Sequence, residues 1–285
     1  MSIVVTGATG ALGRLVVEEL LDRVPADRVA VVVRDPAKAA DLAGRGVDVR
    51  VADYDDPAAL AGAFRAGDRV LLISGNQIGR RVAQHTAVLE AARAAGVAQL
   101  AYTGVLGGPE ADFDLAAEHR ATERAVLDSG VPYTFLRNGW YHENYTAQLP
   151  AALERGTVIA SAGGGRVASA ARADYAAAAA AVALTGEGHL NRAYELSGDT
   201  AWSFAEYTAE LSAQSGREVT YTEVPAAEHL AALTGAGVPE SFAAVLVDVD
   251  AAIARGRLAG TSGDLARLIG RPTTPLAEAI SAALA

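Results

Sequence analysis

Short apolar runs alternate with longer stretches of helical periodicity along the first half of the chain. The runs that we interpret as strands are residues 2–5, 29–33, 47–51, 70–73, 99–102 and 133–137. Most of them are rich in valine, isoleucine and leucine without polar alternation, which is typical of parallel strands that are buried on both faces. Because a helical stretch follows nearly every run, the pattern predicts an α/β fold with a doubly wound parallel sheet.

From residue 146 onward the alternation of strands and helices loosens, and helical patterns dominate to the end of the chain. The apolar residues at 193–197 predict a strand that rejoins the sheet, and residues 219–222 predict a small separate strand. We therefore expect a sheet domain over residues 1–145 and a smaller α/β lobe over residues 146–285, with no linker between them.

The first strand, residues 2–5, leads directly into a glycine-rich turn at residues 6–13 and then into a helical pattern. Gly7 is expected to allow the tight turn, Gly10 to let a phosphate approach the backbone, and Gly13 to let the helix pack on the strand. The N–H groups at the start of the helix would bind the pyrophosphate of a dinucleotide. Strand, turn and helix together predict a Rossmann-type domain, and an ordinary strand–turn–helix corner is the alternative interpretation.

The second strand ends at Arg34, which precedes Asp35-Pro36 at the start of the next helix. In a dinucleotide-binding domain this position faces the adenosine ribose, where an acid binds the 2′-hydroxyl of NAD and an arginine suits the 2′-phosphate of NADP. Arg34 therefore favours NADPH. The alternative is a solvated arginine beside Asp35.

Polar residues also follow the later strands, at the edge where ligands bind in doubly wound sheets. The acids at 53–56 either lie near the adenine or cap the following helix, and the loop at 74–76 is expected to line the cofactor. Thr103 and Tyr102 are candidates for contact with a substrate carbonyl, with strand packing as the alternative. His85 is expected to be packed or at a helix surface.

Residues 138–145 form the densest cluster of hydrogen-bonding aromatic residues in the chain, directly after a strand. Aromatic rings offer stacking faces to a nicotinamide or a flat substrate, and Tyr, His and Asn offer polar contacts. A packing hinge between the two parts of the chain is the alternative. A metal site at His142 and Glu143 is not expected, because no third ligand is spaced with them. The pair His119 and Glu123, one helical turn apart, is interpreted as a solvated surface pair, and an acid/base pair behind the site is the alternative.

The composition excludes several kinds of chemistry. The chain has no cysteine, which excludes disulfides, thiolate catalysis and cysteine-ligated metals. The net charge of -10 argues against nucleic acid or an anionic membrane as a partner. The alanine run at 176–181 is too short to span a membrane, and no leader peptide is expected, so we predict a cytoplasmic protein.

Lys38 is the only lysine in the chain. A Walker loop requires a Gly-Lys pair, which is absent, so phosphoryl transfer of that type is excluded. The Tyr-x-x-x-Lys proton relay of most short-chain reductases is also absent, because position 34 is arginine.

The chain resembles the NmrA-like atypical short-chain dehydrogenase/reductase family. The resemblance rests on the glycine motif, on Arg34-Asp35-Pro36, on the stretch at 137–141 and on the segment 169–175. Within it, the likeness is strongest to the bacterial NAD(P)H:quinone oxidoreductases of type 2, and it covers essentially the whole chain. The resemblance implies an NADPH-binding domain, a small C-terminal lobe and a quinone site between them. It implies cofactor contacts at Gly7, Ala8, Thr9, Gly10, Ala11, Leu12, Arg34, Ser74, Gly75, Asn76, Gln77, Ile78, Gly139, Trp140, Tyr141 and Arg172.

We therefore predict that the chain reduces quinones to hydroquinones by direct hydride transfer from NADPH. A hydroquinone oxygen is weakly basic, so donors near the oxygens suffice and the missing relay is tolerable. The predicted catalytic donors are Tyr141, His142 and Asn144, with Tyr141 as the proton donor. No metal is expected, and a homodimer is a candidate assembly. The alternatives are a non-catalytic NAD(P)-binding redox sensor and a reductase of another carbonyl or enone.

Overall fold

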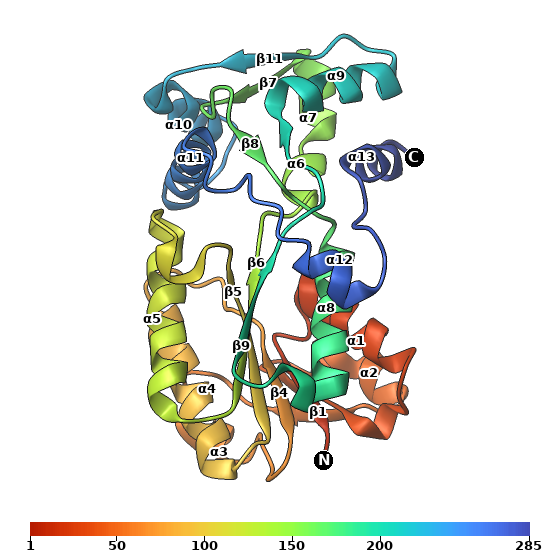
Figure 1. The fold of residues 1–285 in the computed structure, drawn as a ribbon, viewed down its shortest axis with the longest axis vertical. Coiled ribbons are helices and arrows are strands. Elements are labelled where there is room, and N and C mark those ends of the chain that lie inside the picture. The colour runs from red at the N-terminus through yellow and green to blue at the C-terminus, as the bar shows by residue number, and fades with distance from the viewer.

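The computed structural model describes all residues from 1 to 285. Its main feature is a sheet of seven parallel strands in the order β3-β2-β1-β4-β5-β6-β9 (Figure 1). The strands are β1 (Ile3–Thr6), β2 (Val29–Val33), β3 (Asp48–Val51), β4 (Arg69–Leu72), β5 (Gln99–Val105), β6 (Tyr133–Asn138) and β9 (Arg192–Leu196). Successive strands are added on one side of β1 up to β3 and on its other side from β4 onward. Doubly wound folds bind ligands at this switch point between β1 and β4.

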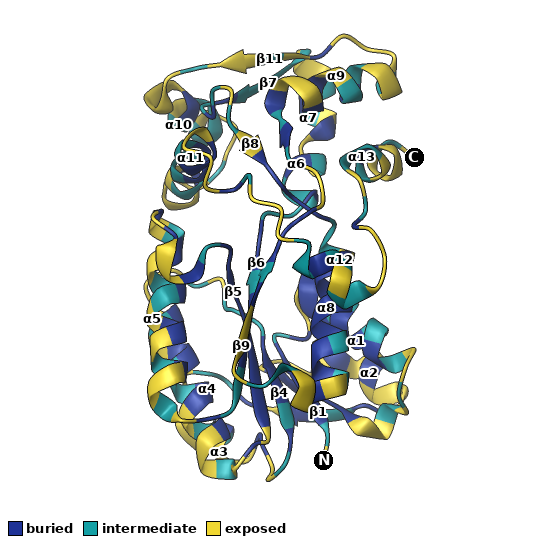
Figure 2. Ribbon diagram, viewed as in Figure 1, coloured by how far each residue is buried: buried dark blue, intermediate teal, exposed yellow.

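Each face of the sheet is covered by helices that bury a separate apolar cluster. The helices on one face are α1 (Ala11–Leu21), α2 (Ala40–Gly44), α8 (Arg172–Thr185) and α12 (Asp264–Ile269). The helices on the other face are α3 (Pro57–Ala61), α4 (Arg81–Ala95) and α5 (Asp114–Ser129). All five residues of β2 are buried, as the unbroken apolar run predicted for a parallel strand covered on both sides. The residues of β5 are likewise all buried (Figure 2).

A smaller lobe lies beyond the carboxyl ends of the strands, with its own apolar cluster. Its helices are α6 (Glu143–Thr146), α7 (Leu149–Arg155), α9 (Phe204–Ser215), α10 (Ala226–Gly235), α11 (Glu240–Ala254) and α13 (Leu276–Leu284). Its strands form two short pairs: β7 (Thr157–Ala160) with β11 (Thr220–Glu223), and β8 (Arg166–Val167) with β10 (Trp202–Ser203). Four single-turn 3-10 helices lie at Ala26–Arg28, Pro36–Ala39, Gly108–Glu110 and Gly186–His189.

The predicted doubly wound sheet is confirmed, and so is the return of the chain to it: β9 pairs with β6 from Thr134 to Asn138. The alanine-rich α8 packs on α1 in the sheet domain, because its small side chains let the two helices approach closely. Asp174, which precedes the alanine run, lies within the first turn of this helix and is not its N-cap. Helix α8 begins at Arg172, and the buried Asp174 carboxylate accepts a hydrogen bond from the Thr274 N–H at 2.8 Å.

Candidate functional site

The glycine turn between β1 and α1 has the geometry that the sequence predicted. Gly7 has a φ of +61°, a conformation that side chains rarely adopt. A Cβ on Gly13 would lie 2.3 Å from the carbonyl oxygen of Gly7, so only glycine lets the helix start this close to the turn. No side chain caps α1 at Gly10, and its first turn holds no acid. The first N–H groups of α1 are therefore free to bind an anion.

Arg34 stands at the carboxyl end of β2, next to this turn, with an exposed side chain that makes no ion pair. Tyr54 lies nearby, and its buried hydroxyl faces Thr6 and Gly7 without a hydrogen bond of ordinary geometry. Burial raises the pKa of Tyr54 to about 12, so the hydroxyl remains a donor at neutral pH. Next to it, Asp56 accepts hydrogen bonds from the N–H groups of Ala58 and Ala59 and caps α3, which confirms the capping interpretation for this acid.

Buried polar side chains accept hydrogen bonds from the backbone of the loop after β4, residues 74–78. The Ser74 N–H donates to Thr103 Oγ1 at 2.8 Å, and the Gly75 N–H donates to His85 Nε2 at 3.0 Å. Burial and the nearby Arg81 lower the pKa of His85 to about 3, so the ring is neutral. His85 is thus a packed histidine, as expected, and Thr103 positions the loop.

Tyr102 and His119 are packed inside the sheet domain and do not line the predicted cofactor site. The Tyr102 hydroxyl is 2.7 Å from His119 Nδ1, and both side chains are buried between β5 and α5. The expectation that His119 and Glu123 are solvated is wrong. Their side of α5 packs on β5 and β6, where Glu123 accepts two hydrogen bonds from the Arg137 guanidinium at 2.8 and 2.9 Å. A spacing of one helical turn specifies a shared face but not whether that face is buried.

The segment after β6 crosses from the sheet into the lobe. The Gly139 N–H donates to the Leu196 carbonyl at 2.7 Å, and a Cβ on Gly139 would lie 3.0 Å from the same oxygen. Tyr141 follows, with the guanidinium carbon of Arg172 5.1 Å from its ring centre. Asn138 Nδ2 donates to the Tyr141 hydroxyl at 3.2 Å, and burial raises the pKa of that hydroxyl.

Asn138 also carries a polar atom that the sequence did not single out. Its Oδ1 is buried and has no hydrogen-bond partner. It lies at the carboxyl end of β6, next to the residues predicted to contact the nicotinamide. An unpaired buried acceptor is costly, so this oxygen marks a position where a ligand donor would be stabilised. Its sequence signal was its place at the start of the cluster at 138–145, directly after a predicted strand.

His142 has both ring nitrogens engaged within the protein. Nδ1 is 2.8 Å from Ser169 Oγ, which also accepts from Trp202 Nε1 at 2.9 Å. Nε2 donates to the Thr274 carbonyl at 2.9 Å, and burial lowers the pKa of the ring. The imidazole therefore fastens the C-terminal segment to the start of α6, and this geometry leaves it no free nitrogen for a substrate.

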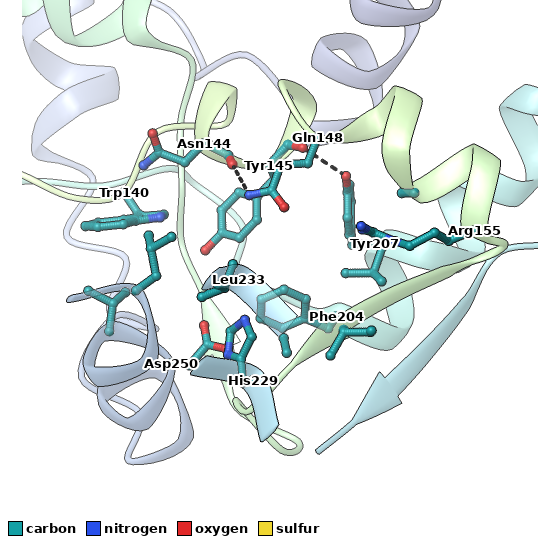
Figure 3. A pocket seen from close by; sticks show the side chains of 16 residues that line it. Trp140, Asn144, Tyr145, Gln148, Arg155, Phe204, Tyr207, His229, Leu233 and Asp250 are labelled. Carbon is teal, nitrogen blue, oxygen red and sulfur yellow. Dashed lines mark hydrogen bonds and ion pairs between the residues drawn. The ribbon is translucent and has the colours of Figure 1, made fainter. Parts of the chain in front are cut away.

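Asn144 lines a cavity inside the lobe together with Trp140 (Figure 3). Tyr141, in contrast, packs toward Tyr175 on the side of the sheet domain, with ring centres 5.1 Å apart. The structure therefore brings the glycine turn, Arg34, the loop at 74–78 and Asn138–Tyr141 to the same edge of the sheet. It does not bring Tyr141, His142 and Asn144 together. Tyr141 packs on Tyr175, His142 bonds to Ser169 and Thr274, and Asn144 lines the cavity inside the lobe.

Comparisons with known proteins agree with this arrangement. A family model described as NAD(P)H-binding matches residues 7–185. The chain is 50% identical to "Quinone oxidoreductase 2" of Escherichia coli over 98% of this chain and 97% of the relative. The crystal structure of that NADPH-dependent enzyme in complex with NADPH has a TM-score of 0.96, at 49% identity over 99% of this chain and all of the other.

Two further relatives carry other names. The structure of Citrobacter sp. triphenylmethane reductase complexed with NADP(H) has a TM-score of 0.94, at 42% identity over 99% of this chain and all of the other. An NmrA-like oxidoreductase of Aspergillus flavus is 29% identical over 98% of this chain and 94% of the relative. None of the helices combines the length and apolar character that crossing a membrane requires.

Proposed function

Because the chain belongs to the NAD(P)H-binding family, whose model spans residues 7–185, we propose that it is an NADPH-dependent reductase of quinones. The observation that carries the proposal is the glycine turn. Helix α1 starts close to β1, its first N–H groups are not capped by a side chain, and the unpaired Arg34 lies next to the turn. The identity of 50% to a quinone oxidoreductase over nearly the full chain supports the choice of acceptor.

The residues at the strand ends fit the cofactor. The first N–H groups of α1 would bind the pyrophosphate, and Arg34 would pair with the 2′-phosphate of the adenosine ribose. Asn138 Oδ1, an unpaired buried acceptor, would accept from the carboxamide of the nicotinamide. Tyr141 and Arg172 complete the predicted contacts around that ring, whereas the side chain of Trp140, also predicted there, lies on the cavity inside the lobe. When bound, NADPH supplies the hydride.

Tyr141 is the proposed proton donor, since quinone reduction consumes one hydride and one proton. Asn138 Nδ2 donates to the oxygen of the Tyr141 hydroxyl, which leaves that hydroxyl's own proton free for the acceptor. The raised pKa keeps the phenol protonated at neutral pH. The cation of Arg172 beside the ring would stabilise the phenolate that remains after transfer. Among the three predicted catalytic residues, geometry favours Tyr141 over His142.

The test is the consumption of reduced nicotinamide by the purified protein, with NADPH against NADH, and with and without 1,4-benzoquinone. Fast loss of NADPH that depends on the quinone supports the proposal. Tight NADPH binding without turnover across several quinones supports instead the sensor function. Rapid reduction of a triphenylmethane dye or an enone together with slow reduction of quinones supports a different acceptor.

A cytoplasmic location and a homodimer remain predictions. Cell fractionation and light scattering of the purified protein test them separately.

A further inference from the structure

A cavity of about 70 Å³ lies inside the C-terminal lobe. Two of its lining residues, Trp140 and Asn144, were predicted site residues, but none comes from the glycine turn, from Arg34 or from the loop after β4. Its apolar lining includes Trp140, Phe204, Tyr207, Leu233, Leu246 and Val249. This predominantly apolar and aromatic lining suits an aromatic ring. Figure 3 shows the aromatic side chains around the space, with α10 and α11 below them.

The hydroxyl of Tyr145, on the cavity wall, is buried and has no hydrogen-bond partner. The ring cannot easily turn away, because Trp202 and Phe204 hold it with ring centres 4.7 and 5.7 Å distant. A buried O–H without an acceptor is unfavourable in the empty protein. The hydroxyl therefore indicates that an oxygen from outside the chain binds here.

A second polar side chain lies on the opposite wall. His229 is 94% buried, and its Nδ1 is 3.1 Å from Asp250 Oδ2, whose position is fixed by the Ser161 N–H at 2.8 Å. Its Nδ1 also lies 3.1 Å from Ser161 Oγ, and no protein group hydrogen-bonds to Nε2, so this second nitrogen is free to pair with a ligand. In Figure 3 the His229 ring lies beside Asp250 and below Tyr145.

The same geometry argues against a nucleophilic triad. Ser161 Oγ is 3.1 Å from His229 Nδ1, the nitrogen that also faces Asp250. A hydrolytic triad requires the serine and the carboxylate on different ring nitrogens. The cluster is therefore built to bind a polar group rather than to activate Ser161.

We propose that this cavity binds a small phenol: a single aromatic ring that carries a hydroxyl. The ring would pack between Trp140 and Phe204. Its hydroxyl would accept a hydrogen bond from Tyr145, which satisfies the unpaired group, and would pair with His229 Nε2, since a hydroxyl can act as donor or acceptor there.

The test compares phenol with toluene, which has the same shape but no hydroxyl, by calorimetry on the full-length protein. Quenching of tryptophan fluorescence offers a second readout, because one of the two tryptophans, Trp140, lines the cavity and the other, Trp202, packs on Tyr145. Phenol is expected to bind at least tenfold more tightly than toluene.

Two matched variants locate the site. Tyr145→Phe removes the unpaired hydroxyl, should fold normally, and should abolish the preference for phenol. Tyr207→Phe removes a hydroxyl on the same cavity that already donates to the Tyr145 carbonyl at 3.3 Å, and should retain the preference. Equal binding of phenol and toluene, no binding of either, or a preference that survives in Tyr145→Phe would overturn the proposal.

Titration with 1,4-hydroquinone identifies the source of the ligand. If hydroquinone binds as tightly as phenol, the product of the proposed reaction occupies the cavity. If phenol alone binds, the ligand is a phenol from outside the reaction. Only this assignment rests on the proposed function. The binding itself is measured without turnover, so its failure and the failure of the reductase assay are independent.

Discussion

The side-chain amide of Asn138 donates to the hydroxyl of Tyr141 at 3.2 Å, while the other amide atom, Oδ1, is buried without a partner. One residue thus presents a donor to the proposed proton donor and an acceptor to the space beside it. Because Asn138 ends β6, the sheet fixes the position of both groups. This relationship links the predicted nicotinamide site to the predicted proton delivery.

Replacing Tyr141 with phenylalanine should lower kcat for quinone reduction by about 100-fold or more, the usual size of a general acid contribution. The affinity for NADPH should change less than threefold, because the ring beside Arg172 is retained. Steady-state kinetics and NADPH fluorescence titration measure the two effects. Tyr133→Phe, on a half-buried strand tyrosine stacked on Phe135, is the control and should leave both unchanged. An unaltered kcat in Tyr141→Phe would remove this hydroxyl from the mechanism.

Arg34→Ala should weaken NADPH binding by about 10- to 100-fold, the effect of losing hydrogen bonds between charged groups. The affinity for NADH should be nearly unchanged, since NADH has no 2′-phosphate. Calorimetry with both cofactors measures the difference. Arg28→Ala removes an exposed arginine at the opposite end of β2 and should alter neither affinity. Equal losses for the two cofactors would show that Arg34 does not bind the 2′-phosphate.

The sequence predicted the sheet and its cofactor edge well, because both depend on local patterns. Apolar runs identify β1 and β2, and the glycine spacing identifies a turn whose backbone geometry only glycine allows. The resemblance to NmrA-like reductases then supplied the expected acceptor. A strand or a glycine turn can be predicted in this way because residues that are neighbours along the chain determine it.

Contacts between distant parts of the chain were not predictable in this way. The partners of His142 are Ser169 and Thr274, far away in sequence, so a site of three adjacent residues was the simplest hypothesis. The cavity of Tyr145, His229 and Asp250 likewise joins elements that no spacing rule connects. The burial of His119 and Glu123 depends on where α5 packs, which periodicity alone does not give.

Two buried neutral histidines should make stability depend on pH. Burial lowers the pKa of both His85 and His119 to about 3, whereas an unfolded histidine has a pKa of about 6.5. The unfolded state thus binds more protons between these values, so their contribution is complete above pH 6.5 and is lost as the pH falls toward 3. The free energy of unfolding should fall by about 1.4 kcal/mol per pH unit for each histidine below pH 6.

Urea unfolding between pH 7.5 and 5 measures this slope above the range where most carboxylates titrate. His85→Gln provides an amide oxygen that can accept from the Gly75 N–H but does not titrate. It should therefore reduce the slope by one histidine's share. A stability that stays constant from pH 7.5 to 5 would contradict the prediction, as would an unchanged slope in the variant.

Gly13→Ala should damage both folding and cofactor binding at the glycine turn. The added Cβ would lie 2.3 Å from the Gly7 carbonyl and 2.7 Å from the Ala8 Cα, both backbone atoms that cannot rotate away. Helix α1 must therefore shift from β1, at a cost of about 1–3 kcal/mol in unfolding free energy. The shift also moves the free N–H groups that are proposed to bind the pyrophosphate, so NADPH affinity should fall more than tenfold. Urea unfolding and calorimetry measure the two losses.

Gly44→Ala, whose Cβ would meet nothing within 4 Å, is the control and should leave NADPH affinity unchanged. A Gly13→Ala protein with normal stability and normal NADPH affinity would show that the close start of α1 is not what forms the phosphate site.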